Sequence, residues 1–275
     1  MYVRELLRII RPSPASGGGL ELLKEMEENG SVTAGFVRAP STGTTYPIKD
    51  GYLDLLGRRT GAHNIANLTN FSPGAGPAYE PLWRTRSLTL LTGQKFPNDR
   101  EIEVIAGLAR LDRGGLYLDL GCSAGLYTRS LDAKLGNRGT VLGIDIAPTM
   151  LKEAVRRARR AGVRPSFARA DAENLPFADE SFDGAVCGGT LNELGDPARA
   201  LREARRVLAP GGRVAIMGLL QATTTRGRLL QRFLSKGGLR FVKPEEVESL
   251  LDHAGFEPDP LLTHGTVFFA GATRR

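Results

Sequence analysis

Three aspartate residues, Asp119, Asp145 and Asp171, each follow a short apolar run of the chain. Segments with helical spacing separate these runs, so the pattern predicts buried strands that alternate with helices in a parallel sheet. The carboxyl ends of parallel strands meet at one edge of the sheet, where open α/β sheets bind their ligands. The chemistry that these carboxylates offer together is the recognition of a bound molecule through hydrogen bonds.

A turn of small residues follows the first of these aspartates. Residues 121–125 read Gly-Cys-Ser-Ala-Gly, and residues 126–135 then have helical spacing. Small residues let a ligand approach the backbone, and the N–H groups at a helix start face it. Asp145 lies about 20 residues beyond the turn, the spacing of a group that accepts hydrogen bonds from ribose hydroxyls. Taken alone, the glycine pattern also fits a close turn that binds nothing.

Two common nucleotide-binding motifs are missing from the chain. Residues 121–125 do not supply the G-x-G-x-x-G pattern of nicotinamide dinucleotide sites. The chain also contains no G-x-x-x-x-G-K-[ST] phosphate loop. A dehydrogenase and a nucleotide hydrolase are therefore not favoured.

Four motifs in order resemble those of the class I S-adenosylmethionine-dependent methyltransferases, and most closely their small-molecule, type 11-like branch. They lie at residues 119–125, 143–145, 170–177 and 207–213, and the resemblance runs from about residue 101 to the end of the chain. It implies a Rossmann-like α/β fold with a mostly parallel seven-stranded sheet and an antiparallel last strand. Ser123 stands where the family usually has glycine, and we expect the turn to survive because serine is small.

The resemblance also implies S-adenosyl-L-methionine as the cofactor and assigns residues to its parts. Asp145 would accept from the ribose hydroxyls, with Ile146 against the adenine. Asp171 would accept from the adenine amine, and the Ala172 N–H would meet a ring nitrogen. The methionine end would contact the first aspartate, the turn and a backbone carbonyl: Asp119, Gly121, Cys122, Ser123, Gly125 and Gly188. Met150 is also expected to bind the cofactor.

A methyl sulfonium is already electrophilic, so such a site needs alignment and exclusion of water rather than a fixed triad. Glu193 is the candidate general base, with Asn192 as the amide that orients it. The two residues equally fit the start of the next connection. The expected acceptor pocket adds two residues of this loop, two aromatic residues upstream and one downstream: Thr190, Leu191, Tyr79, Trp83 and Phe233. Trp83 fits a packing anchor as well as a pocket wall.

The chain is expected to fall into three segments. Residues 1–59 form a small β-rich unit, residues 60–98 a connector that covers the pocket, and residues 99–275 the cofactor-binding domain with a lid-like insert at 221–240. The first segment resembles the zinc-ribbon module that precedes some methyltransferase domains. The places of the family's zinc ligands carry residues that do not bind zinc, so no metal is expected: Arg11, Pro14, Ala39 and Thr42. An unrelated β-rich appendage is the alternative.

Composition sets outer limits on the protein class. The chain has 275 residues, enough for one α/β domain and a small extra unit. No apolar run approaches the ~20 residues of a membrane span, and the two cysteines, Cys122 and Cys187, cannot build a disulfide scaffold. We therefore expect a cytoplasmic protein. The net charge of +7 permits a nucleic acid partner, but the spread of arginine along the chain favours a solvated surface.

These observations favour an enzyme that methylates an oxygen or carbon atom of a small, largely apolar metabolite, such as a quinone, a polyketide or another aromatic intermediate. One alternative is a guanine-N methyltransferase acting on ribosomal RNA, which the zinc-ribbon likeness and the basic charge support and the missing metal ligands oppose. The second alternative is a non-catalytic cofactor-binding protein.

Overall fold

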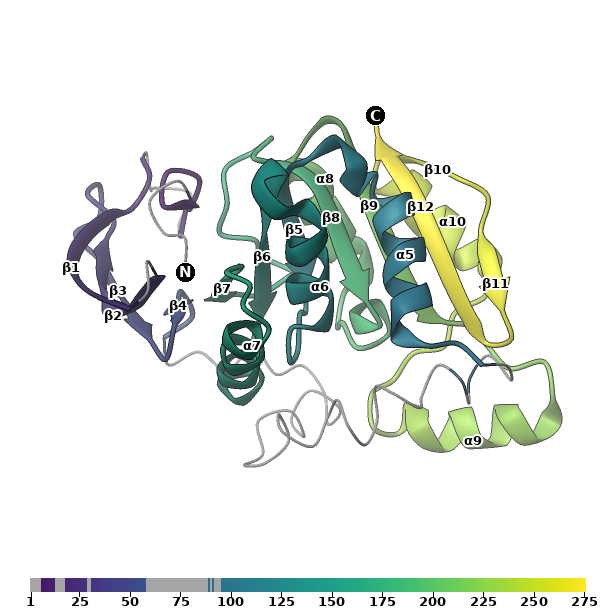
Figure 1. The fold of residues 1–275 in the computed structure, drawn as a ribbon. Coiled ribbons are helices and arrows are strands. Elements are labelled where there is room, and N and C mark those ends of the chain that lie inside the picture. The colour runs from purple at the N-terminus through teal and green to yellow at the C-terminus, as the bar shows by residue number, and fades with distance from the viewer. Residues whose placement is uncertain (1–5, 13–17, 29–30, 58–88, 90, 92–94) are drawn as a thin grey trace.

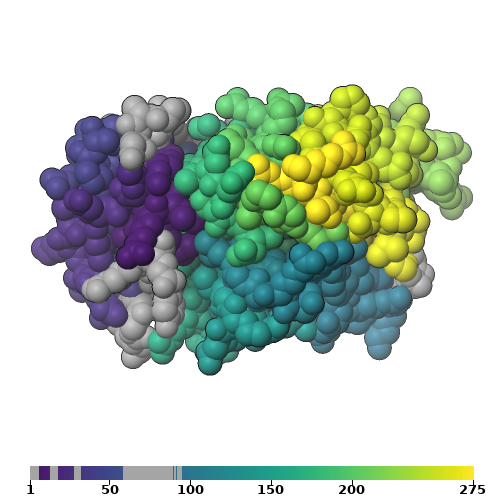
Figure 2. Space-filling model, turned by 90° about the horizontal axis from the view of Figure 1, so that it is seen from above, coloured from purple at the N-terminus to yellow at the C-terminus, as the bar shows by residue number. Residues whose placement is uncertain are grey.

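The computed structural model describes residues 6–12, 18–28, 31–57, 89, 91 and 95–275. The predicted connector at 60–98, with Tyr79 and Trp83, lies largely outside these described residues. In Figure 2 the N-terminal strands and the C-terminal strands lie at opposite ends of the molecule. One sheet runs between them, with the strand order β1-β2-β3-β4-β7-β6-β5-β8-β9-β12-β10.

The seven strands from β7 to β10 confirm the predicted sheet. The parallel strands are β5 (Gly115–Leu120), β6 (Gly139–Asp145), β7 (Ser166–Arg169), β8 (Phe182–Gly188) and β9 (Leu208–Leu219). The last strand, β12 (Val267–Arg274), is antiparallel to β9. Two short strands, β10 (Phe256–Pro258) and β11 (Leu262–His264), pair with β12.

Helices cover both faces of this sheet (Figure 1). One face packs against α5 (Asn98–Leu108), α6 (Leu126–Leu135) and α7 (Pro148–Arg160). The other packs against α8 (Pro197–Val207) and α10 (Pro244–His253). Short 3-10 turns lie at Leu111–Arg113, Gly136–Arg138 and Thr190–Asn192. None of the described helices is long and apolar enough to cross a membrane.

The sequence explains why these helices begin where they do. The Asp196 carboxylate accepts the Arg199 N–H at 2.9 Å, and Pro197 occupies the first turn of α8, a place where its missing N–H costs nothing. Along α7 the apolar residues recur every three or four positions, so Leu151, Ala154 and Ala158 face the sheet. Helix α10 begins in the same way, with Pro244 in its first turn.

The N-terminal segment extends the same sheet. It contains β1 (Glu21–Glu28), β2 (Ser31–Arg38), β3 (Thr45–Lys49) and β4 (Tyr52–Asp54), paired antiparallel in sequence order. β4 then pairs parallel with β7. The expected β-rich unit is present, but it continues the main sheet, and its boundary at residue 59 stays a prediction. Among the described residues no cluster of His, Cys, Asp and Glu could hold a metal.

Hydrogen bonds within the chain close the turn at Ala39 and Thr42, two residues that stand at the places of the family's zinc ligands. Ala39 is fully buried, and its N–H donates to the Thr44 carbonyl at 2.9 Å. The Gly43 N–H donates to the Ala39 carbonyl at 2.8 Å, and the Thr42 hydroxyl donates to that of Thr44 at 3.0 Å. Arg11 bonds to the backbone, and Pro14 lies outside the described residues. This turn is therefore held by hydrogen bonds and by a buried alanine.

A buried ion pair fastens the N-terminal strands to the rest of the sheet. Asp54 is 2% exposed and Arg169 is 5% exposed. The Arg169 Nη1 lies 3.3 Å from each carboxylate oxygen of Asp54 and donates to the Gly57 carbonyl at 2.6 Å. Its Nε donates to the Ile146 carbonyl at 2.9 Å. Arg169 thus connects the N-terminal segment to the residue that follows Asp145.

Removing the Asp54 carboxylate should destabilise the protein. Asp54→Ala leaves Arg169 buried without this partner, so the free energy of unfolding should fall by about 3–5 kcal/mol in a denaturant titration. The control is Glu21→Ala, which breaks an exposed pair with Arg38 between β1 and β2 and should cost less than about 1 kcal/mol. Equal losses in both variants would contradict this account.

Candidate active site at the carboxyl edge of the sheet

The carboxyl ends of the parallel strands gather the predicted site residues at one edge of the sheet. β5 pairs with both β6 and β8, so the turn at residues 121–125, Asp145 and Gly188 follow neighbouring strands. In Figure 1 this is the edge toward which β8 points. The carboxyl ends of β5, β6 and β8 therefore lie together at this edge, as parallel pairing requires.

The turn adopts left-handed backbone at three positions. Gly121, Ser123 and Gly125 have φ values of 68°, 49° and 78°. Glycine adopts this region without strain, whereas serine does so at a cost. The Ser123 N–H donates to Oδ2 of Asp145 at 2.9 Å, which ties the unusual residue to the next strand end. The turn therefore keeps its predicted shape with serine in place of glycine.

Two backbone N–H groups fix the Asp145 carboxylate. Besides Ser123, the Ala147 N–H donates to Oδ1 at 2.8 Å. Burial raises the pKa of Asp145, and these N–H donors act in the opposite direction. A carboxylate offers about four acceptor positions, so two bonds leave room for the paired hydroxyls of a ribose. Asp145 thus fits the cofactor role expected for it, and Ile146 beside it is half-buried.

Three residues predicted to contact the cofactor lie beneath the turn instead. Asp119 is 1% exposed, and the Thr128 hydroxyl donates to its Oδ2 at 2.6 Å. Met150 is 1% exposed and accepts from the Ser123 hydroxyl at 3.6 Å. Cys122 is buried too, and burial raises the pKa of its thiol. Side chains so buried offer little surface to a ligand, so they support the turn from below, and their contact with the cofactor stays a prediction.

Gly188 provides space for an aromatic ring rather than only a carbonyl. A Cβ at this position would lie 2.7 Å from the Tyr127 ring. The Tyr127 hydroxyl donates to the Glu101 carboxylate, and both residues are buried. This pair was not predicted from the sequence. The sequence nevertheless contains an indication of a buried polar contact. Glu101 lies on the same helical face as Ile105 and Leu108, where an apolar residue is expected.

The third strand end carries Asp171 and Ala172. Asp171 is half-buried and its Oδ1 accepts the Glu173 N–H at 2.9 Å. Ala172 is 7% exposed. The Glu173 side chain accepts the N–H groups of Gly195 and Asp196 at 2.8 and 3.0 Å, which joins this strand end to the loop after β8. The adenine contacts of Asp171 and Ala172 stay predictions, and Glu173 is a positioning residue that sequence reasoning missed.

The loop after β8 separates into buried and accessible residues. The Thr190 hydroxyl donates to the Gly121 carbonyl at 3.1 Å, so Thr190 lies against the turn. Leu191 is 4% exposed and packs in the core, and its place in the acceptor pocket stays a prediction. Asn192 is 1% exposed. Its Nδ2 donates to the Leu219 and Arg240 carbonyls at 3.0 and 2.6 Å, and its Oδ1 accepts the Leu219 N–H at 2.8 Å.

Both amide hydrogens of Asn192 are therefore used by the backbone, and none is left to donate to Glu193. The prediction that Asn192 orients Glu193 is corrected: it fastens the loop to β9 and to the segment near Arg240. Glu193 itself is the strongest chemical candidate of the loop. Burial, followed by the charge of Asp145, raises the pKa of Glu193 to about 7. A carboxylate with this pKa is suited to accept a proton near neutral pH.

The insert at 221–240 forms a helix, α9 (Thr225–Ser235). Phe233 on this helix is 70% exposed. Its place in the acceptor pocket stays a prediction. Tyr79 and Trp83, the other predicted walls, lie outside the described residues.

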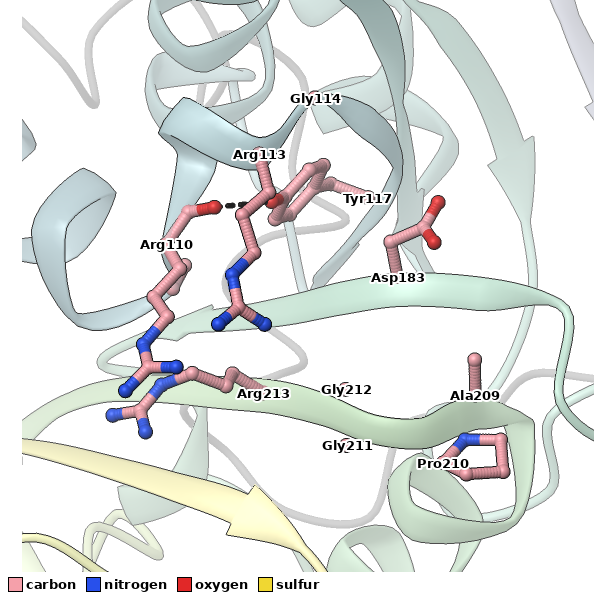
Figure 3. A pocket seen from close by; sticks show the side chains of 11 residues that line it. Arg110, Arg113, Gly114, Tyr117, Asp183, Ala209, Pro210, Gly211, Gly212 and Arg213 are labelled. Carbon is pink, nitrogen blue, oxygen red and sulfur yellow. Dashed lines mark hydrogen bonds between the residues drawn. The ribbon is translucent and has the colours of Figure 1, made fainter.

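A separate cavity of about 150 Å³ lies at the opposite edge of the sheet (Figure 3). It is lined by the amino ends of β5 and β8 and by the turn that begins β9, and its cationic residues are Arg110, Arg113 and Arg213. The Tyr117 hydroxyl donates to the Arg110 carbonyl at 2.8 Å beside it. Because it lies at the amino ends of the strands, this cavity is not part of the candidate active site.

Comparisons with known proteins agree with this geometry. A methyltransferase domain family matches residues 118–216. The chain is 33% identical over 183 residues to 27-O-demethylrifamycin SV methyltransferase from Amycolatopsis mediterranei, covering 64% of this chain and 65% of that protein. It is 32% identical over 168 residues to demethylmenaquinone methyltransferase from Staphylococcus epidermidis, covering 58% and 69%. The chain thus spans slightly less than two thirds of the length of the rifamycin relative.

A solved structure shares the fold. The cyclase SpnF superimposes with a TM-score of 0.57 at 23% identity, over 65% of this chain and 81% of that one. At this level of identity the likeness concerns the fold alone.

A side chain at Gly121 should disturb the site through two separate effects. Gly121→Ala places a Cβ 2.3 Å from the Thr190 hydroxyl, an overpacking that costs about 1–3 kcal/mol. Its left-handed backbone adds about 1–2 kcal/mol. In a denaturant titration, adding Thr190→Gly to Gly121→Ala should recover only the free energy lost to the close contact, and not the backbone cost.

Gly43→Ala is the matched control for that experiment. Its φ is 69°, and a Cβ there meets nothing within 4 Å. It should show the backbone cost alone. If Gly121→Ala and Gly43→Ala lost the same free energy, the close contact between Thr190 and the turn would be disproved.

Proposed function

Because the chain belongs to the class I S-adenosylmethionine-dependent methyltransferases, we propose that it is an enzyme that methylates an oxygen or carbon atom of a small, largely apolar metabolite. The observation that carries this proposal is the Asp145 carboxylate, held at the end of β6 by two N–H groups beside a left-handed turn. The proposed setting is the cytoplasm.

The described residues fit the cofactor. Asp145 would accept from the ribose hydroxyls, and Asp171 with the Ala172 N–H would meet the adenine. The backbone of the turn, at Gly121, Ser123 and Gly125, would lie against the methionine end together with the Gly188 carbonyl. The bound cofactor supplies an electrophilic methyl group. The chain's own part is to position the acceptor, exclude water and remove a proton where the acceptor carries one.

Glu193 is the residue we propose for proton removal. It lies at the end of the loop after β8, and its pKa of about 7 leaves a substantial fraction ionised at neutral pH. A hydroxyl acceptor must lose its proton as the new bond to carbon forms, and a carboxylate within reach can accept it. An acceptor that is already ionised would not need this group.

The substrate class is inferred from the relatives. Two of them are named as methyltransferases of a demethylated rifamycin and of demethylmenaquinone. Both names describe molecules with large apolar or aromatic parts, and this supports a similar class of acceptor here. The alternatives, an RNA base or no acceptor at all, are outcomes that the following measurements distinguish.

The first measurement is cofactor affinity. Isothermal titration with S-adenosylmethionine, or with its demethylated product, should show binding. Asp145→Ala should weaken it by about 1–3 kcal/mol, or roughly ten- to a hundredfold, because the hydroxyl contacts are lost. Asp252→Ala, which breaks an exposed ion pair with Arg275, should bind like the wild type. Undiminished binding by Asp145→Ala would show that the cofactor lies elsewhere.

The second measurement is the pH dependence of methyl transfer. With labelled cofactor and a panel of hydroxylated quinones and polyketide aglycones, kcat/KM should rise with pH through about 7, because Glu193 is protonated below this pH and ionised above it. Glu193→Gln should abolish the rise and lower kcat/KM about a hundred- to ten-thousandfold.

Glu257→Gln, at an exposed position, is the control and should keep the wild-type profile. A Glu193→Gln enzyme with an unchanged profile would exclude Glu193 as the base. Labelling of RNA in place of the metabolite panel would favour the RNA methyltransferase, and binding without any transfer would favour the non-catalytic protein.

A further inference from the structure

The helix α9 exposes three large apolar side chains. Leu229, Leu230 and Phe233 are 68%, 59% and 70% exposed, and we call them the α9 apolar surface. Residues three and four positions apart share one side of a helix, so Leu229 and Phe233 lie together, with Leu230 beside them. No residue of α9 is buried. Large apolar side chains that lie together in water on one short helix mark a surface for an interaction.

The opposite side of α9 holds the helix on the protein. Gln231 is two positions from Phe233, which places it on the other side of the helix. Its Oε1 accepts the Ala222 N–H at 2.8 Å, and its Nε2 donates to the Leu220 carbonyl at 2.9 Å. The Thr224 hydroxyl caps the helix by accepting the Gly227 N–H at 3.1 Å. The apolar surface is therefore presented outward by a specific attachment rather than by fraying.

Positive charge surrounds the apolar surface. Residues 221–243 contain six Lys or Arg and no Asp or Glu: Arg226, Arg228, Arg232, Lys236, Arg240 and Lys243. Among the residues that the structure describes, no ion pair involves any of these six. Elsewhere on the same molecule arginines pair with carboxylates, as Arg206 does with Glu203. Within the described part of the chain, these six cations therefore lie near exposed leucine and phenylalanine without a carboxylate partner.

We propose that α9 is a docking helix for an anionic membrane surface, with Leu229, Leu230 and Phe233 inserted between the lipids and the surrounding arginines and lysine at the phosphate level. Apolar residues on one side with Lys and Arg around them are the features of helices that lie in a membrane interface. The cations draw such a segment to anionic lipids. Nucleic acid would match the charge but would leave the aliphatic side chains in water, and a protein partner would need acidic groups to match the same positions.

The place of α9 suggests what the docking serves. In Figure 1 the helix lies at the edge of the sheet toward which β8 points, the edge of the candidate active site. The segment after α9 is fastened to the loop after β8. The Arg240 N–H donates to the Asn192 carbonyl at 2.8 Å, and the Asn192 side-chain amide donates to the Arg240 carbonyl. A membrane-docked α9 would hold this loop near the lipid. The supply of a lipid-soluble acceptor by this route rests on the proposed function, whereas the docking itself does not.

The test is vesicle flotation without cofactor or acceptor. The full chain should float with vesicles of phosphatidylcholine mixed with phosphatidylglycerol and remain behind with phosphatidylcholine alone, and added salt should weaken the binding. Phe233→Ser should lower the partition coefficient about tenfold, because an inserted aromatic side chain is lost. Arg226→Gln combined with Arg232→Gln should reduce binding to the mixed vesicles.

The matched control is Phe36→Ser, which removes a phenylalanine that is 49% exposed on β2, at the other end of the sheet. It should float like the wild type, and unchanged melting temperatures should show that all variants are folded. Equal loss of binding in Phe36→Ser and Phe233→Ser would overturn the proposal. Failure of the wild-type protein to float would also overturn it. So would binding of the protein to RNA that Phe233→Ser leaves unchanged. Because no methyl transfer is measured, failure here would leave the proposed function untouched.

Discussion

A carboxylate at the end of a buried strand must keep its charge and its position while most of its surroundings are apolar. At Asp145 two backbone N–H groups do this, one from Ser123 in the preceding turn and one from Ala147 in the next. The first donor lies in left-handed backbone, in a turn where Gly121 and Gly125 have the same conformation. The geometry of one side chain therefore constrains two connections and the pairing of β5 with β6.

That constraint extends outward through further polar contacts. Arg169 donates to the carbonyl of Ile146, next to Asp145, and also binds Asp54 in β4. Glu173 joins the end of β7 to the loop after β8, and Asn192 joins that loop to β9. Each of these groups is buried and hydrogen-bonded, as buried polar groups must be. The edge of the sheet is thus a connected polar layer over an apolar core.

The parts of this arrangement that follow from local patterns could be predicted from the sequence. Alternating apolar runs and helical segments indicated the parallel strands, and the resemblance implied the antiparallel last strand, which is β12. Burial could not be predicted in the same way. Met150 and Leu191 were assigned to ligands by position, yet each is at most 4% exposed, because neighbours distant in sequence cover them. The strand β1 was missed because its residues, Glu-Leu-Leu-Lys-Glu-Met-Glu-Glu, suit a helix as well as a strand, and pairing with β2 decides the matter.

The pairing of β4 with β7 has a consequence for how the chain folds. Arg169 lies 115 residues after Asp54, so the contact between them closes a very long loop. A ribosome releases the first four strands well before β7, and contacts of this sequence separation form late. Until then the free side of β4 is an exposed strand edge, and such edges invite pairing with other chains. Asp54 places a charged group on that edge, which discourages pairing with other chains until Arg169 emerges and buries it.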